Sequence, residues 1–359
     1  MEVKSFFTDF LSNIRLTDYQ VNDLKTGHTT LRKRLLEDEE ISSIIVNTFL
    51  QGSYRRATAV RPKNGNKSDV DVIVVTNLNT DDYTPQEALD LFIPFLDKFY
   101  SGKYKMQGRS IGIELSYVEL DLVITSAPSE SQKDLLNSES VLISESLEEL
   151  QNWSLSKSWG IFNQEQKNEP TWKTEPLLIP DREAGKWEKT DPLAQIKWTW
   201  DKNAACNSHY VNVVKALKWW KKLNPTPKYP KGYPLEHLIG TCCPDGIASV
   251  AEGVTLTLEN IIANYPDKPV LNDHGVPEHD VFKRITEEEY EEFYNLVEDA
   301  ASLARQAYDC PDKVESIELW RKLFGSKFPE PPTNLTKKQI SGFTPRTEPT
   351  KSVSGGRFG

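Results

Sequence analysis

The chain has 359 residues, of which 38% are hydrophobic and 27% are charged, and its formal net charge is −10. These proportions are typical of a globular protein large enough for two packed domains, and they exclude a fibrous or mainly disordered chain. The acidic balance argues against a protein that coats nucleic acid, because phosphate contacts need clustered Lys and Arg.

The N-terminal residues do not predict secretion. Residues 1–7 lack the apolar core of a secretory signal. No stretch approaches the roughly 20 apolar residues that cross a bilayer. The four cysteines lack zinc-ligand spacing, so we expect reduced thiols. The sequence therefore predicts a cytoplasmic protein with no membrane partner.

The first predicted elements are a helix and a strand that leads into a turn. Residues 17–37 form a helical pattern with an apolar face of leucines, and residues 47–50 form a short strand. The strand runs into Gln51, Gly52 and Ser53. Glycine allows a sharp turn close to a ligand, and a serine beside free backbone N–H groups suits an anion. The turn therefore predicts a phosphate site.

A second strand, over residues 69–75, begins with two acids, Asp69 and Asp71. Alternate residues of a strand share a face, so these carboxylates lie together and repel each other unless cations separate them. Oxygen ligands of this kind suit Mg²⁺ with substrate phosphates. A third acid, Asp121, is expected on a neighbouring strand over residues 119–125. The alternative is a hydrogen-bonded or salt-bridged structural aspartate.

The remaining chain is predicted to change from strands to helices. Strands are expected over residues 103–107 and 110–116, and a helix opens at Thr84. Residues 126–190 predict an irregular connection with a helix or two. The later pattern is mainly helical as far as Phe324.

These motifs resemble a known family. Gln51-Gly52-Ser53 with Asp69, Asp71 and Asp121 is similar to the DNA polymerase β-like nucleotidyltransferase superfamily. Residues 215–220 and 229–238 are similar to its oligoadenylate synthetase and cyclic GMP–AMP synthase branch. Within that branch the chain resembles the bacterial CD-NTases of clade D, the cyclic-oligonucleotide synthases of CBASS antiphage operons. The details that bring it nearest are residues 107–110, 118–121 and 227–233.

The resemblance implies an α+β fold with two lobes. Residues 1–190 are expected to form the nucleotidyltransferase catalytic domain, with a mixed β-sheet and a long N-terminal helix that spans both lobes. Residues 191–328 are expected to form the α-helical, oligoadenylate synthetase-like domain. Residues 329–359, rich in Pro, Thr, Ser, Lys and Gly, are expected to be a disordered tail.

The resemblance also assigns roles to side chains. Asp69, Asp71 and Asp121 are expected to be catalytic and to hold two Mg²⁺ ions, for which Mn²⁺ can substitute. Two residues carry open alternatives: Lys218 as a solvated helix-face lysine and Tyr233 as a packing tyrosine. The residues expected to bind nucleotide are Gln51, Gly52, Ser53, Lys215, Lys218 and Tyr233.

The implied activity joins ATP and GTP through 3′–5′ phosphodiester bonds with release of pyrophosphate. The product would be a cyclic di- or trinucleotide that acts on a CBASS effector, and stable binding of nucleic acid is not expected. Three alternatives stay open. They are a transferase with a linear product, of the oligoadenylate or RNA-tailing type, a protein nucleotidylyltransferase, and a non-catalytic nucleotide-binding module.

The last residue, Gly359, suggests a further partner. Many relatives stand in operons with a ubiquitin-activating-like enzyme that joins the synthase's C-terminus to targets. Such chemistry needs a flexible C-terminal carboxylate on a small residue, and Gly359 meets that requirement. The alternative is an ordinary chain end.

Overall fold

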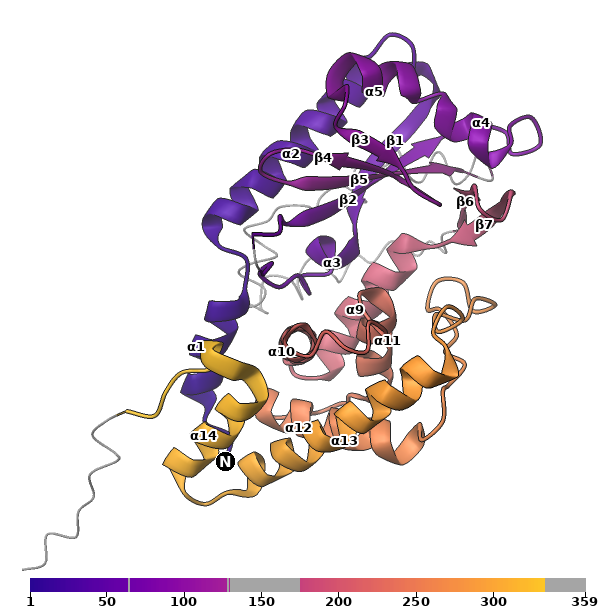
Figure 1. The fold of residues 1–359 in the computed structure, drawn as a ribbon. Helices are drawn as coiled ribbons and strands as arrows, with labels where there is room; N and C mark the ends of the chain where they lie inside the picture. Colours follow the sequence, from indigo (N-terminus) through magenta and orange to yellow (C-terminus); the bar gives the residue numbers. More distant parts are fainter. Residues whose placement is uncertain (64, 128, 130–174, 333–359) are drawn as a thin grey trace, which may run out of the picture.

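The computed structural model describes residues 1–63, 65–127, 129 and 175–332. A sheet lobe and a helical lobe lie end to end (Figure 1). The predicted tail, including Gly359, and most of the predicted irregular connection lie outside the described residues.

The N-terminal segment spans both lobes, as predicted, but as two helices instead of one. Helix α1 covers Lys4–Ile14 and α2 covers Asp18–Glu37. The capping box of Thr17 starts α2. At the break, the Arg61 guanidinium donates to the carbonyl oxygen of Arg15 at 3.0 Å. The break is therefore a built feature, in which side chains satisfy backbone groups that the two helix ends leave free.

The predicted strands form one mixed sheet in the order β1-β2-β5-β4-β3. Only β2 and β5 in this set run parallel, and the other pairs are antiparallel. The strands are β1 (Ile45–Gln51), β2 (Asp69–Thr76), β3 (Tyr104–Met106), β4 (Ile111–Glu114) and β5 (Glu119–Ser126).

The two faces of this sheet differ. Val70, Val72 and Val74 of β2 pack with α2 and with two short helices, α4 (Pro85–Asp90) and α5 (Ile93–Tyr100). The sequence predicts a single helix here. It divides near Leu91, and Pro94 supplies no N–H to continue the ladder. Ile73 and Val75 point to the opposite face, in a separate small core. Asp69 and Asp71 share that second face by alternation.

A hairpin follows the undescribed connection, where the sequence predicted irregular structure. Strands β6 (Leu177–Asp181) and β7 (Lys186–Thr190) pair with each other, and β6 joins β5 through Leu178 and Ser126. The hairpin extends the sheet towards the helical lobe (Figure 1).

The helical lobe has one large core. Its helices are α9 (Pro192–Ala205), α10 (Tyr210–Leu223), α11 (Tyr233–Cys242), α12 (Val250–Asn264), α13 (Glu287–Asp309) and α14 (Lys313–Phe324). Phe7, Phe10 and Ile14 of α1 belong to this core, as do Trp219 and Trp220 of α10. The first helix therefore packs with the second lobe although it opens the chain. In the parts of the chain that are described, no helix has the length and apolar character to span a membrane.

Candidate active site

The acids lie together at the start of two parallel strands. Asp71 is directly opposite Asp121 in the β2–β5 register, and Asp69 is opposite Glu119. Adjacent strands lie about 4.8 Å apart, so these four side chains form one acidic patch on one face. Asp121 thus lies on the face where the sequence predicted it. The sequence reading missed Glu119 as a member, although its spacing from Asp121 repeats that of Asp69 and Asp71.

The patch is electrostatically unfavourable without a cation. Burial, then the charges of Asp121 and Asp69, raise the pKa of Asp71 to about 7. Burial and the charge of Asp69 also raise the pKa of Asp121. An all-oxygen donor set of this kind fits Mg²⁺ or Mn²⁺. Within the described residues no three acidic, imidazole or thiol groups already form a metal-ligand cluster.

The Gly52 turn touches this patch directly. Gly52 has a φ of +76°, and a Cβ atom built there would lie 1.7 Å from Oδ2 of Asp71. Only glycine fits both the backbone angle and the space. Pairing of β1 with β2 places Gln51 opposite Asp71, so the register sets the turn beside the acids. Ser53 follows in the short helix α3 (Gly52–Arg55).

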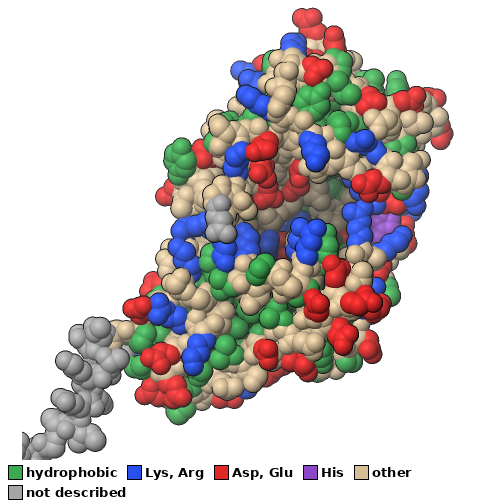
Figure 2. Space-filling view, viewed as in Figure 1, with side chains coloured by type: hydrophobic (Ala, Val, Ile, Leu, Met, Phe, Trp, Pro, Cys, Tyr) green, Lys and Arg blue, Asp and Glu red, His purple; other side chains and the backbone are tan. Residues whose placement is uncertain are grey.

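A cavity of about 990 Å³ joins the turn to the helical lobe. Ligand pockets range from roughly 300 to 1,000 Å³, so this one lies at the upper end of that range. Asp69, Asp71 and Ser53 line its sheet side. The lysines that line it are Lys63, Lys67, Lys218, Lys221, Lys222, Lys228 and Lys231. Figure 2 shows this division of charge, with acidic side chains above the hollow and Lys and Arg below it.

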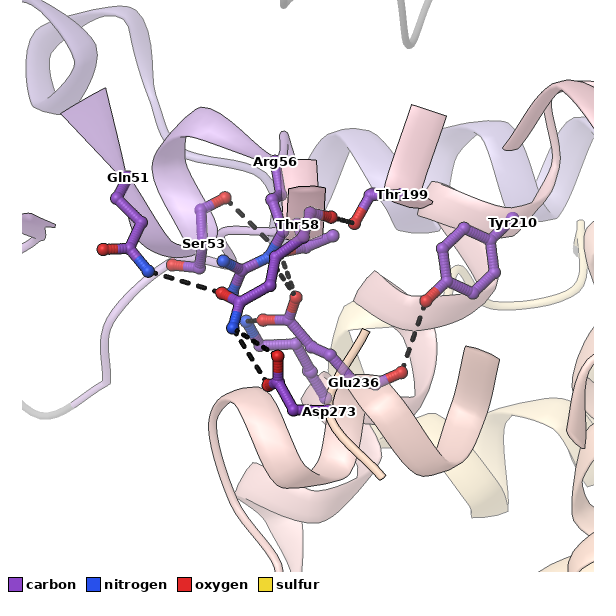
Figure 3. A network of polar contacts seen from close by, with 10 residues as sticks. Gln51, Ser53, Arg56, Thr58, Thr199, Tyr210, Glu236 and Asp273 are labelled. Atoms are coloured by element: carbon purple, nitrogen blue, oxygen red, sulfur yellow. Dashed lines mark hydrogen bonds and ion pairs between the residues drawn. The ribbon is translucent and has the colours of Figure 1, made fainter. Parts of the chain in front are cut away.

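A buried carboxylate connects the two lobes beside the cavity. Glu236 of α11 accepts hydrogen bonds from Arg56 Nε at 3.2 Å, Thr58 Oγ1 at 2.9 Å and Lys218 Nζ at 2.7 Å (Figure 3). Burial alone would raise the pKa of Glu236, but the charges of Lys218 and Arg56 hold it at about 2. Because Arg56 and Thr58 follow α3, the phosphate turn is tied to the helix that carries Lys218.

A second chain of hydrogen bonds starts at Gln51. Its Nε2 donates to Gln195 Oε1 at 3.4 Å, and Gln195 Nε2 donates to an Asp273 carboxylate oxygen at 2.9 Å (Figure 3). Asp273 also accepts from the backbone N–H groups of Gly275 and Val276. Gln51 is therefore held from the helical lobe. Neither Glu236 nor Gln195 was predicted as a site residue, because the links from Gln51 to Gln195 and from Arg56 to Glu236 join residues 144 and 180 positions apart.

The other predicted residues divide in two groups. Lys218 and Tyr233 line the cavity, and Arg56 lies 5.1 Å above the Tyr233 ring centroid. Lys215 is buried and is not among the residues that line the cavity. Burial lowers its pKa well below the ordinary value. This placement does not support the predicted contact of Lys215 with a triphosphate, which stays a prediction.

Comparison with known proteins finds a family model and named relatives that are similar to this chain. Residues 1–137 match the family model described as Second Messenger Oligonucleotide or Dinucleotide Synthetase domain. Over the full length of both chains, the protein is 50% identical to a probable cyclic AMP-AMP-GMP nucleotide synthase of Salmonella paratyphi B. It is 47% identical, again over both full lengths, to the cyclic AMP-AMP-GMP synthase of Enterobacter hormaechei.

The fold agrees with solved structures. The structure of E. coli MS115-1 CdnC with ATP superposes with a TM-score of 0.65 at 17% identity, covering 92% of this chain and 100% of that one. At that identity the likeness concerns the fold alone. The full-length relatives at about half identity decide the family: the chain belongs to the bacterial CD-NTases, a family of polymerase β-like nucleotidyltransferases.

Proposed function

We propose that this enzyme joins two ATP and one GTP into a cyclic AMP-AMP-GMP second messenger for antiphage defence. The observation that carries the chemistry is the acidic pair Asp69 and Asp71, which lines one cavity together with the Ser53 turn and a set of lysines. Asp121 lies directly opposite Asp71 on β5. The choice of product rests on the two full-length relatives, whose names give that trinucleotide.

Each coupling step transfers a nucleotidyl group and releases one pyrophosphate. The 3′-oxygen of one nucleotide forms a bond to the α-phosphorus of another, and the bond from that phosphorus to pyrophosphate breaks. Two bound divalent cations, Mg²⁺ or Mn²⁺, would neutralise the phosphates and lower the pKa of the attacking hydroxyl. Asp69, Asp71 and Asp121 would hold these cations, and the ionised Asp121 would help to take the hydroxyl proton. The ring closes on the third transfer.

The remaining wall residues would position the donor triphosphate. Ser53 and the neighbouring backbone N–H groups would hold its β- and γ-phosphates, and Lys218 would neutralise charge that accumulates on leaving pyrophosphate. Tyr233, at the start of α11, would stack on a base. The volume of the cavity supports retention of a linear intermediate until its own 3′-hydroxyl attacks.

Two predictions concern the cellular setting. The four cysteines are free thiols, which supports a reducing, cytoplasmic location. Conjugation of the C-terminal Gly359 by a ubiquitin-activating-like enzyme follows from the family resemblance. Deletion of Gly359 in cells that carry the complete operon should remove the conjugates and leave the synthase activity unchanged in vitro.

The test of the activity is incubation with the four ribonucleoside triphosphates and Mg²⁺, with one nucleotide omitted at a time. Mass spectrometry should find a phosphatase-resistant product with two AMP units and one GMP unit, which disappears without ATP or GTP. A double Asp69→Asn, Asp71→Asn variant should make none. A phosphatase-sensitive ladder would favour a linear-product enzyme, a labelled protein band would favour protein nucleotidylylation, and absent pyrophosphate would favour a binding module.

A further inference from the structure

The side chain of Gln107 lies against the third acid. Its Nε2 donates to Asp121 Oδ1 at 3.1 Å, and its Oε1 accepts from the Ser110 hydroxyl at 2.9 Å. A carboxylate only accepts hydrogen bonds, so the amide must present its NH₂ group to Asp121. The Ser110 hydroxyl holds the opposite end of the same amide. The orientation of Gln107 is therefore fixed from both sides.

The neighbouring strand leaves space for this amide. Gly112 of β4 is directly opposite Asp121 of β5. A Cβ atom at Gly112 would lie 2.5 Å from Gln107 Nε2 and 3.5 Å from Asp121 Oδ1. Any larger residue would push the amide away from the carboxylate. The small size of Gly112, rather than its backbone freedom, is what the contact requires.

The turn that carries Gln107 is anchored to the β6–β7 hairpin. The backbone N–H of Arg182 donates to the Gly108 carbonyl at 2.9 Å. The Arg109 guanidinium donates to Asp181 Oδ2 at 2.7 Å and also pairs with Glu188. These contacts fix the turn from a segment outside the catalytic strands. They give a role to residues 107–110, which the proposed chemistry otherwise leaves unused.

We infer that Gln107 is a positioning residue, which holds Oδ1 of Asp121 and so directs its other oxygen towards the cation and the attacking hydroxyl. The inference rests on the proposed function. Residues that orient metal ligands typically affect metal affinity or activity about 10- to 100-fold. Gln107 itself is exposed, so its loss should leave the fold intact.

The test compares Gln107→Leu with Gln306→Leu, a matched control. Gln306 is also exposed and donates one side-chain hydrogen bond, to Ser302 Oγ at 3.1 Å, but it lies on α13 outside the cavity lining. Mn²⁺ binding is measured by electron paramagnetic resonance with a non-hydrolysable ATP analogue. Gln107→Leu should weaken Mn²⁺ binding about 10-fold and lower kcat about 10- to 100-fold, with KM for ATP changed much less. Gln306→Leu should match wild type.

A second variant approaches the same contact from the other strand. Gly112→Ala keeps every polar group but occupies the space of the amide, so it should reproduce the losses of Gln107→Leu. If wild type makes product and Gln107→Leu equals Gln306→Leu in both measurements, the inference is wrong. A lower Tm with unchanged Mn²⁺ binding would also overturn it, because Gln107 would then be structural. A wild-type chain without product would instead refute the proposed function.

Discussion

Replacement of Asp71 by asparagine should stabilise the metal-free protein while it removes activity. The carboxyl of Asp71 has a pKa raised from 3.8 to about 7, first by burial and then by the charges of Asp121 and Asp69. In the unfolded chain it would return to about 3.9. The folded protein therefore holds more protons than the unfolded protein between about pH 4 and pH 7, so the free energy of unfolding falls as pH rises through that window.

The size of the effect follows from the shift. About 3 pKa units at 1.36 kcal/mol each give about 4 kcal/mol of lost stability at pH 8. At pH 5 only about 1.5 kcal/mol is lost. At that pH the Asp71 carboxyl is protonated in the folded protein, and the loss is the free energy needed to protonate the mostly ionised carboxylate of the unfolded chain. Asparagine carries no charge, so the advantage of Asp71→Asn over wild type should grow by about 2.5 kcal/mol from pH 5 to pH 8.

Urea unfolding in EDTA measures this difference at each pH. Asp81→Asn, at an exposed loop acid, serves as the control and should show little change. Added Mg²⁺ with a non-hydrolysable nucleotide should stabilise wild type and not Asp71→Asn. A metal-free Asp71→Asn variant that is less stable than wild type at pH 8 would refute the reasoning, because the carboxylate would then be favourable in the fold.

Three further predictions concern the Gly52 turn, the Glu236 contacts and the packing of α1. Gly52→Ala should lower kcat about 100-fold, because the new Cβ would overlap the Asp71 carboxylate and a misplacement of about 1 Å at a reacting group has that effect. Steady-state kinetics measures the change, with Gly65→Ala as the control. Glu236→Ala should cost about 3–5 kcal/mol in urea unfolding, because it leaves the buried Arg56 guanidinium without its partner and also removes the ion pair with Lys218. Phe10→Ala should cost about 3–5 kcal/mol if α1 belongs to the helical core, whereas Phe6→Ala, which is only partly buried, should cost clearly less.

The local parts of the fold could be predicted from the sequence. Short apolar, β-branched runs identified the strands that carry Asp71 and Asp121, and the capping residue Thr84 marked the start of α4. These signals act over a few residues. The β6–β7 hairpin was not predicted because both strands are only five residues long, β6 contains Pro180, and β7 is polar and partly exposed. The proposed domain boundary at residue 190 remains a prediction, and the packing of α1 shows that the two cores do not follow chain order.

The candidate site shows the same limit. Gly52, Ser53 and the acids belong to local motifs, so they could be predicted as site residues from the sequence. The residues that hold them, such as Glu236 and Gln195, carry no motif, because their role depends on which segments pack together. Lys215 shows what a local motif cannot decide. It lies one helical turn from Lys218, yet packing turns one lysine towards the cavity and buries the other.

Like charges gather on each side of the cavity. The carboxylates of Asp71 and Asp121 repel each other within the sheet, and the lysines that line the cavity repel one another as well. Nucleotide with divalent cations would supply positive charge to one wall and negative charge to the other, so its binding relieves both walls at once. Until it binds, the contacts of Glu236 with Arg56, Thr58 and Lys218 hold the walls at a fixed distance. The same charges that destabilise the empty cavity therefore favour its occupation, and the interlobe carboxylate keeps it ready for substrate.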